Sequence, residues 1–199
     1  MARRDTSQSK WKKKKWVEVV APQNFNAISL GHTLVEDTPH AVGRVITTNM
    51  MNVVKNPRMQ SVSMKFKVIE IKEGIGHTHP VGYTMAQSAI KRLVRARRDR
   101  IDDSFVVKSK DDVLVRVKPL VITHNNYAGS QRAAVREMLR SHIATYVASH
   151  PYATFVDTVV NGTFQKETKV ALQKLLPIRT VDMRAFAVVD PARAKAIVQ

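Results

Sequence analysis

Strand-like and helical segments occupy different parts of this chain, and their separation restricts the fold more than any other feature. Short β-branched segments bounded by Gly, Pro or Asn occur at 16–22, 29–35 and 43–48, whereas apolar residues at helical spacing dominate 130–175. Because strands and helices do not alternate along the chain, this order predicts an α+β fold and not a doubly wound parallel sheet.

The segment VSMKFKVIEIK at 62–72 has the clearest alternation of apolar and polar residues. The apolar residues keep one phase up to Val68, and the phase then switches to Ile69 and Ile71. A change of phase within one strand indicates a bulge or a sharp bend. We therefore predict a curved antiparallel sheet or a β-barrel.

A hairpin is predicted within the segment 101–124, with its turn near 110–112. After the turn, valines alternate with Leu114, Arg116 and Lys118. Pro119 has no N–H group to donate to a ladder, so it marks an edge strand or a bulge. The segment VDMRAFAVV at 181–189 is predicted to form a closing strand.

Apolar spacing and terminal residues predict four helices. The first covers about 84–98, where Thr84 and Gln87 fit a capping box. The other three cover about 130–149, 151–162 and 165–175.

Basic residues outnumber acidic residues by a wide margin. Lys and Arg number 33 against 16 Asp and Glu, which gives a formal net charge of +17 at pH 7. An excess of this size produces a positive potential over much of the surface. The polyanions that such a surface attracts are nucleic acid and anionic membrane.

A dense group of cations lies at the N-terminus, opposed there only by Asp5. Its members are Arg3, Arg4, Lys10, Lys12, Lys13, Lys14 and Lys15. Because this segment has no apolar periodicity, we predict a basic RNA-binding arm over 1–16 that is disordered when free and orders on RNA. The rest of the chain is predicted to form one α+β domain over 17–190 and a C-terminal tail over 191–199.

Trp11 and Trp16 flank the four-lysine run at 12–15. On a helix these two side chains would point about 140° apart, which argues against an amphipathic helix on a membrane surface. The chain also has no apolar run of transmembrane length, so no membrane partner is predicted. We predict that Trp11 stacks on an unpaired base or a ribose, and that Trp16 begins the first strand and packs on the core.

A second group of cations falls on the predicted helix at 84–98. Lys91, Arg92, Arg95 and Arg98 lie on the face opposite its apolar stripe, and Arg97 and Arg100 extend the group. A solvated helix face normally mixes charges, since like charges at i,i+4 repel. This one-signed face therefore predicts phosphate binding. Arg132, Arg136 and Arg140, four residues apart on the next helix, form a weaker set of the same kind.

The sequence contains no pattern typical of catalysis or of metal binding. Cysteine is absent, which excludes thiolate chemistry and Cys-ligated zinc and fits a cytoplasmic protein. His77 and His79 are two possible ligands without a third, and the Gly and Pro residues around them predict a loop at 73–82. The acidic pairs at 102–103 and 111–112 are assigned to turns. No catalytic residue, metal site or cofactor is therefore predicted.

Several segments together resemble one known family. In chain order they read KKKKWVEVVAPQNFN, GHTLVEDT, GRVITTNMMNV, KFKVIEI, RIDDSFVVKSKDDVLVRVKPLVITHN and SQRAAVREMLRSHI. They closely resemble the S3Ae family (eukaryotic-type S1) of small ribosomal subunit proteins, and the compact, cysteine-free chain is most similar to archaeal members. The likeness covers about 12–189, without a clear match at 73–82 or in the last residues.

The resemblance implies a β-barrel-like core with flanking helices and a structural role without catalysis. It implies a place in the cytoplasm on the platform of the small ribosomal subunit, near the mRNA exit. The partners implied are small-subunit rRNA, neighbouring platform ribosomal proteins and mRNA near the exit site. Two other hypotheses stay open from the residues alone. One is an RNA-processing or RNA-modifying enzyme with a basic substrate groove, and the other is a free nucleic-acid or membrane-surface binding module.

Overall fold

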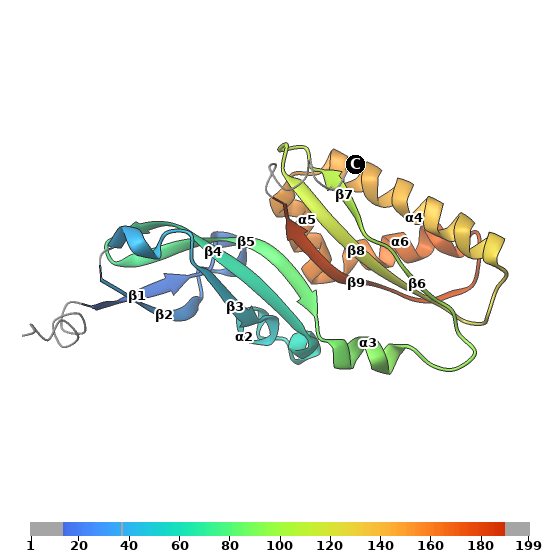
Figure 1. The fold of residues 1–199 in the computed structure, drawn as a ribbon, viewed down its shortest axis with the longest axis horizontal. Helices are drawn as coiled ribbons and strands as arrows, with labels where there is room; N and C mark the ends of the chain where they lie inside the picture. The colour runs from blue at the N-terminus through green and yellow to red at the C-terminus, as the bar shows by residue number, and fades with distance from the viewer. Residues whose placement is uncertain (1–13, 37, 190–199) are drawn as a thin grey trace, which may run out of the picture. The chain divides into compact units, whose positions relative to one another are not determined.

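The computed structural model describes residues 14–36 and 38–189. These residues belong to two compact units, which divide between Val81 and Gly82 (Figure 1). Strand β5 (Ile75–Met85) begins in the first unit and ends in the second. The proposed boundaries of one domain over 17–190 stay a prediction. Most of the predicted arm and the whole of the predicted tail lie outside the described residues.

The first unit contains short strands, short helices and the first part of β5. Its other strands are β1 (Lys15–Val20), β2 (Ser29–Val35), β3 (Val45–Asn49) and β4 (Val62–Lys72). Its helices are η1 (Gln23–Phe25), η2 (Thr38–Ala41), α2 (Met50–Val54) and η3 (Pro57–Ser61). Strand β1 pairs antiparallel with β2 and parallel with β5, and β4 pairs with β3 and β5.

Burial along β4 follows the alternation that the sequence predicts. Apolar side chains are buried at every second position up to Val68, whereas Ile69 is exposed. Ile71, in the new phase, packs against a separate buried cluster of Val17, Val35 and Ala41. After the change of phase, β4 therefore contacts this separate cluster through Ile71.

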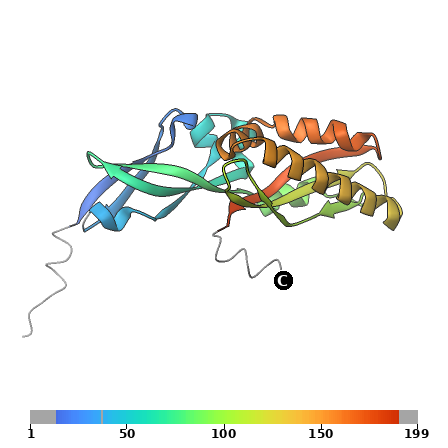
Figure 2. The ribbon, with the colours of Figure 1, turned by 90° about the horizontal axis from the view of Figure 1, so that it is seen from above.

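The predicted loop at 73–82 is wrong, because β5 begins at Ile75 and forms a long hairpin with β4 (Figure 2). The turn is limited to Glu73 and Gly74, which both have positive φ. Gly76 does not mark a loop but a close approach between strands, since an added Cβ atom would lie 3.5 Å from Val19 and Val68 side chains. Glycine in a strand often has this role.

The second unit combines four strands and four helices within the described residues. The strands are β6 (Arg100–Asp102), β7 (Phe105–Lys108), β8 (Leu114–Thr123) and β9 (Ile178–Val188). The helices are α3 (Gln87–Leu93), α4 (Gly129–Ser149), α5 (Tyr152–Asn161) and α6 (Thr163–Gln173). The predicted hairpin is confirmed as β7 and β8. The three later helices are confirmed to within about two residues at each end.

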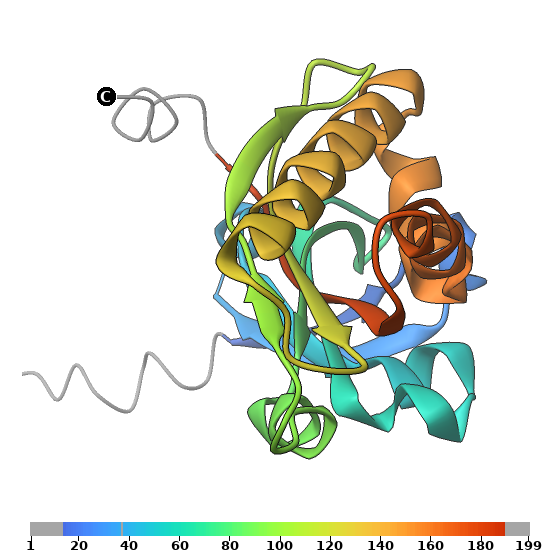
Figure 3. The ribbon, with the colours of Figure 1, turned by 90° about the vertical axis from the view of Figure 1, so that its right-hand side faces the viewer.

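The strands of the second unit have helices on both faces. Helices α4, α5 and α6 lie on one side (Figure 3), where Phe186 of β9 contacts Phe155 of α5 and Tyr152. On the opposite face, Leu120 and Ile122 of β8 pack against Ile90 of α3. Side chains alternate between the faces of a strand, so odd-numbered β8 residues face α4–α6 and even-numbered residues face α3.

The prediction of a barrel is wrong, because the nine strands of the described residues form a sheet that does not close. Its path is β2-β1-β5-β9-β8-β6, and the β1–β5 pair is parallel. Closure would require the last strand to pair with the first, but the short strands β6 and β7 both pair with β8 instead. The predicted mixture of helices and strands is present, and the register shift at Pro119 confirms a bulge there.

The helix predicted over 84–98 is also wrong in extent, because α3 covers only Gln87–Leu93. Thr84 does not cap the helix but pairs with Ala185 of β9. At the other end, Val94 adopts an extended backbone conformation. A longer helix would bring its cations within i,i+3 and i,i+4 contact of one another, which is unfavourable without anions between them.

Candidate nucleic-acid interface

Six of the predicted RNA-binding residues lie outside the described part of the chain. They are Arg3, Arg4, Lys10, Trp11, Lys12 and Lys13. Lys14 is half-buried, and Lys15 begins strand β1 with an exposed side chain. The arm therefore contributes only these two cations to the geometry described below.

Four exposed cations follow one another at the end of α3 and in the loop after it. Lys91 and Arg92 lie in the last turn of α3, and Arg95 and Arg97 lie in the loop. These four residues are called the basic segment. Cations at the C-terminal end of a helix are stabilised by its carbonyl groups, and Arg92 Nε donates to Ser88 O at 3.4 Å.

None of the four side chains of the basic segment forms an ion pair with residues 14–36 or 38–189. Arg98 differs from them, because it is half-buried and its Nη1 has no hydrogen-bond partner among those residues. The basic segment thus keeps the one-signed charge that the sequence predicts, but on a helix end and a loop. Its four guanidinium or ammonium groups are available to phosphates.

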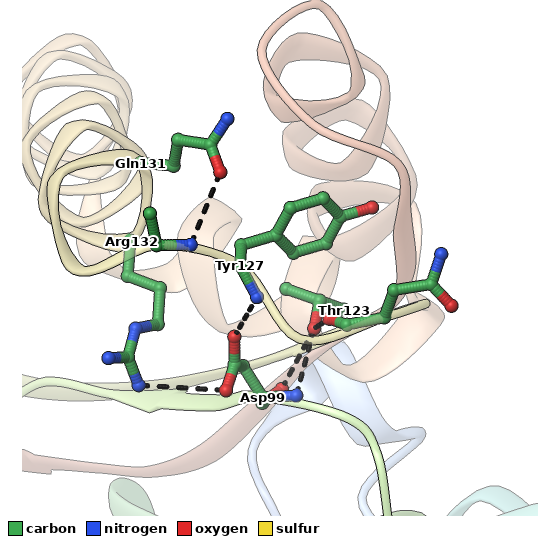
Figure 4. A network of polar contacts seen from close by, with 7 residues as sticks. Asp99, Thr123, Tyr127, Gln131 and Arg132 are labelled. Atoms are coloured by element: carbon green, nitrogen blue, oxygen red, sulfur yellow. Dashed lines mark hydrogen bonds and ion pairs between the residues drawn. The ribbon is translucent and has the colours of Figure 1, made fainter.

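Arg132 of α4 belongs to a network of polar contacts around Asp99 (Figure 4). Its Nη1 lies 3.5 Å from Asp99 Oδ1, and the backbone N–H of Tyr127 donates to Asp99 Oδ2 at 2.7 Å. The backbone N–H of Asp99 donates in turn to Thr123 Oγ1 at 3.0 Å. This network ties the loop before β6 to the start of α4.

Arg140 of α4 binds Asp103 through two hydrogen bonds, one from Nε and one from Nη2, the latter at 2.8 Å. Its guanidinium also lies 6.0 Å from the centre of the Phe105 ring. Asp103 is only 8% exposed, and hydrogen bonding to Arg140 lowers the pKa of its carboxyl group. Arg136 lowers that pKa further through its charge.

Two of the three α4 arginines therefore have carboxylate partners within the protein. The guanidinium groups stay about half-exposed, at 47% for Arg132 and 54% for Arg140. Their first structural effect is to hold the segment around β6 against α4. RNA contacts by this set stay a prediction.

Changing Arg140 to glutamine is expected to lower the thermal midpoint at neutral pH by a few degrees. The change would leave the nearly buried Asp103 carboxylate with the Ser104 N–H as its remaining hydrogen-bond donor. Arg136→Gln is the matched control, because Arg136 has no ion pair within the described residues, and it should have little effect.

The pH dependence of the same variant gives a second check. Pairing lowers the pKa of Asp103, so its stabilisation is present at neutral pH and is lost as the pH falls through the lowered value. The difference in thermal midpoint between the native chain and Arg140→Gln should therefore become smaller in acid. A difference that stays constant with pH would contradict this account.

Two cations that sequence analysis did not assign to binding lie on the β8 face opposite α4–α6. They are Arg116 and Lys118, which are half-buried and have no ion pair in the described chain. On the same face, Asp102 pairs with both Arg100 and Arg184, the latter at 3.2 Å. The alternation VLVRVKP contained the signal, because it places Arg116 and Lys118 on one face.

The described residues form neither a cluster of metal ligands nor a membrane-spanning helix. No group of three or more His, Cys, Asp or Glu side chains there could hold a metal ion. His77 and His79 both lie on β5, and burial lowers the pKa of His79. No helix in the same residues is long and apolar enough to cross a bilayer.

Unpaired cations grouped on a loop and on a sheet face are typical of proteins that bind nucleic acid through its phosphates. This chain belongs to the ribosomal S3Ae family, whose model matches residues 2–191. The match includes the hairpin at 73–82, where the sequence alone showed no clear resemblance.

Curated relatives of this chain include archaeal proteins that are named small ribosomal subunit protein eS1. The protein from Nanoarchaeum equitans is 31% identical over 176 residues, which cover 88% of this chain and 89% of that protein. The protein from Methanosphaerula palustris is 28% identical over 173 residues, or 87% of each chain. The protein from Saccharolobus islandicus is 29% identical over 182 residues, or 92% of this chain and 88% of that one.

Proposed function

We propose that this chain is a structural component of the small ribosomal subunit that binds rRNA and supports subunit assembly and translation. Membership of the S3Ae family carries the proposal. The free cations of the basic segment, together with Arg116 and Lys118, support it, because rRNA is the polyanion of that particle. The chain acts by binding and not by catalysis.

The position on the platform near the mRNA exit belongs to the same proposal. There the chain contacts small-subunit rRNA, neighbouring platform proteins and mRNA at the exit site, in the cytoplasm. The arm over 1–16 enters the rRNA, and the basic segment contacts phosphates from the surface of the second unit. The net charge of +17 supports this arrangement, since it is the excess of 33 Lys and Arg over 16 Asp and Glu.

Co-sedimentation tests the proposal directly. A tagged full-length chain expressed in an archaeal host should sediment with small subunits in a sucrose gradient and should stay bound through moderate salt washes. A chain that stays at the top of the gradient, or sediments only with the large subunit, would contradict the proposal. A basic protein of similar size from outside the ribosome serves as the control for adventitious binding.

Deleting residues 1–13 should weaken RNA binding without changing the stability of the folded part. The deletion removes five of the chain's Lys and Arg residues and ends before β1, which begins at Lys15. We therefore expect a nearly unchanged thermal midpoint, together with lower RNA affinity or poorer incorporation into subunits. A large fall in the midpoint of the free chain would show that the deleted segment packs on the fold.

A further inference from the structure

Helix α3 covers only one end of the sheet face on which it packs. There, Leu120 and Ile122 of β8 pack against Ile90. Toward the start of β8 the same face carries Arg116 and Lys118, which are half-buried and form no ion pair with the described residues. The sheet around these two cations, called the basic sheet face, consists of Gly82, Thr84, Arg116, Lys118, Ala185 and Ala187.

Strand pairing places the residues of the basic sheet face on one side of the sheet. Ala185 of β9 lies between Thr84 of β5 and Lys118 of β8. Ala187, the next β9 residue on this face, pairs with β5 and β8 in the same way. The residue between the two alanines, Phe186, contacts α5 on the other side. The basic sheet face therefore points away from α4, α5 and α6.

Small side chains make the basic sheet face low on two of its three strands. On β5 and β9 the residues are glycine, threonine and alanine, whereas both long side chains come from β8. Thr84 and Ala187 are exposed. A ligand can therefore approach the backbone of β9 closely, with Arg116 and Lys118 along one side of it.

Positive charge predominates on this side of the sheet. The basic segment belongs to the same side, because α3 packs there. Of the two carboxylates that the register places on this face, Asp102 binds both Arg100 and Arg184. The other, Asp182, is half-buried and lies beyond the bulge from the two β8 cations. The charge that stays unpaired is therefore positive, which suits a polyanion.

The strands around the basic sheet face direct their aromatic side chains away from it. Tyr83 stacks on Phe186 on the α4–α6 side, and Phe105 faces the same side beside α4. An exposed indole occurs in the first unit instead. Trp16 of β1 is 70% exposed, which contradicts the prediction that it packs on the core, because Val17 takes the buried position. Within the described chain, the basic sheet face thus has no aromatic ring on which an unpaired base could stack.

We propose that the basic sheet face binds double-helical RNA through its sugar–phosphate backbone. The inference rests on the proposed rRNA-binding function and names the form of RNA that this site takes. Proteins recognise duplex RNA mostly by its shape and through its phosphates and 2′-OH groups. Arg116 and Lys118 bind phosphates, and the exposed hydroxyl group of Thr84 can exchange a hydrogen bond with a 2′-OH group. The low surface between them admits the backbone.

Changing Arg116 and Lys118 together to glutamine tests the charge of the site. For an RNA stem-loop with a long stem, the slope of log K against log[salt] should become less steep by roughly 1.4 to 1.8 units, as expected for two phosphates. Binding of oligo(U), which forms no duplex, should change much less. Lys166→Gln combined with Lys174→Gln is the matched control, because it removes two exposed cations at α6. An unchanged slope for the stem-loop, or an equal change for oligo(U), would overturn the proposal.

Ala187→Leu tests the close approach of the backbone without a change of charge. The larger side chain should lower stem-loop affinity by about tenfold, as expected for the loss of one charge-assisted contact. Ala187→Ser stays small and should retain the native affinity. Ala144→Leu, at an exposed position of α4, controls for a surface leucine elsewhere. Native affinity in Ala187→Leu, or an equal loss in Ala187→Ser, would contradict the inference.

The outcomes for this site and for the proposed function are distinct. Co-sedimentation of the native chain with small subunits tests the function, and the stem-loop series tests the site. If the native chain stays at the top of the gradient while the variants lose stem-loop affinity, the function is wrong and the site stands. If the variants fail to enter subunits but bind the stem-loop as the native chain does, the basic sheet face contacts a neighbouring protein and the inference is wrong.

Discussion

Replacing Lys91, Arg92, Arg95 and Arg97 with glutamine is expected to make RNA binding less dependent on salt. Each cation that neutralises one phosphate contributes about 0.7 to 0.9 to the steepness of log K against log[salt], so the variant should lose roughly 3 units. At 0.1 M salt this corresponds to an affinity lower by roughly a thousandfold. The measurement is the dissociation constant across a salt series for the native and variant chains.

A matched triple variant of α4 tests whether the lost charge or its position matters. Arg132, Arg136 and Arg140 carry three positive charges, but two of them are paired with Asp99 and Asp103. Changing all three to glutamine should therefore reduce the slope less. The reduction per substituted residue should be below half of that in the basic-segment variant. An unchanged slope for the basic-segment variant, with intact folding, would place the RNA contacts elsewhere.

The basic-segment variant should lose a similar amount of affinity for unrelated structured RNAs. Phosphate contacts orient the protein on RNA but carry no direct sequence information. Glutamine keeps the helix propensity of Lys91 and Arg92, so the helical part of the segment should persist. A variant that lost affinity for one RNA only would indicate base contacts by these side chains.

The charges of the basic segment could be predicted from the sequence, but its shape could not. The sequence itself shows six cations from Lys91 to Arg100. The helix was predicted too long because Thr84 and Gln87 fit a capping box locally. Thr84 instead belongs to a strand, because it pairs with Ala185, about a hundred residues away. This pairing leaves no local signal in the sequence.

The partners of the α4 arginines illustrate the same limit. Helical spacing correctly placed Arg132 and Arg140 beside the apolar stripe of α4. Their partners, Asp99 and Asp103, lie directly before and after β6, and Asp103 was assigned to a turn. Only the packing of β6 and β7 against α4 brings these side chains together, so the ion pairs could not be inferred from spacing along the chain.

The opposite case is β8, where the sequence contained more than was inferred. Its alternation predicts that Arg116 and Lys118 share one face, and the register confirms that this face is opposite α4–α6. The sheet that carries it was predicted as a curved antiparallel sheet or a β-barrel, and it does not close. Local periodicity defines strands and their faces. Closure of a barrel depends instead on whether the two edge strands of the sheet pair with each other.

Changing Asp182 to asparagine is expected to stabilise the second unit at neutral pH. Asp182 lies on β9 opposite Leu120, on the face where α3 packs. Burial raises the pKa of its carboxyl group from 3.8 to about 6. The ionised carboxylate is therefore less favourable in the folded chain than in water.

The sign of the pH dependence follows from the raised pKa. Between about pH 4 and pH 6 the folded chain binds more protons than the unfolded chain, so stability falls as the pH rises through this interval. Above it, the ionised group costs about 2 to 3 kcal/mol relative to acid conditions. Asparagine has a similar shape and no charge, so it removes this cost.

We therefore expect Asp182→Asn to raise the thermal midpoint at pH 7 by about 5 °C and to change it little at pH 4. Asp112→Asn is the control, because its side chain is 81% exposed and asparagine tolerates the positive φ of that turn. The measurement is thermal unfolding of both variants and the native chain across this pH interval. A lower midpoint for Asp182→Asn at pH 7 would mean that the carboxylate is paired in solution, with Lys118 and Arg184 as the cations placed on its side of the sheet.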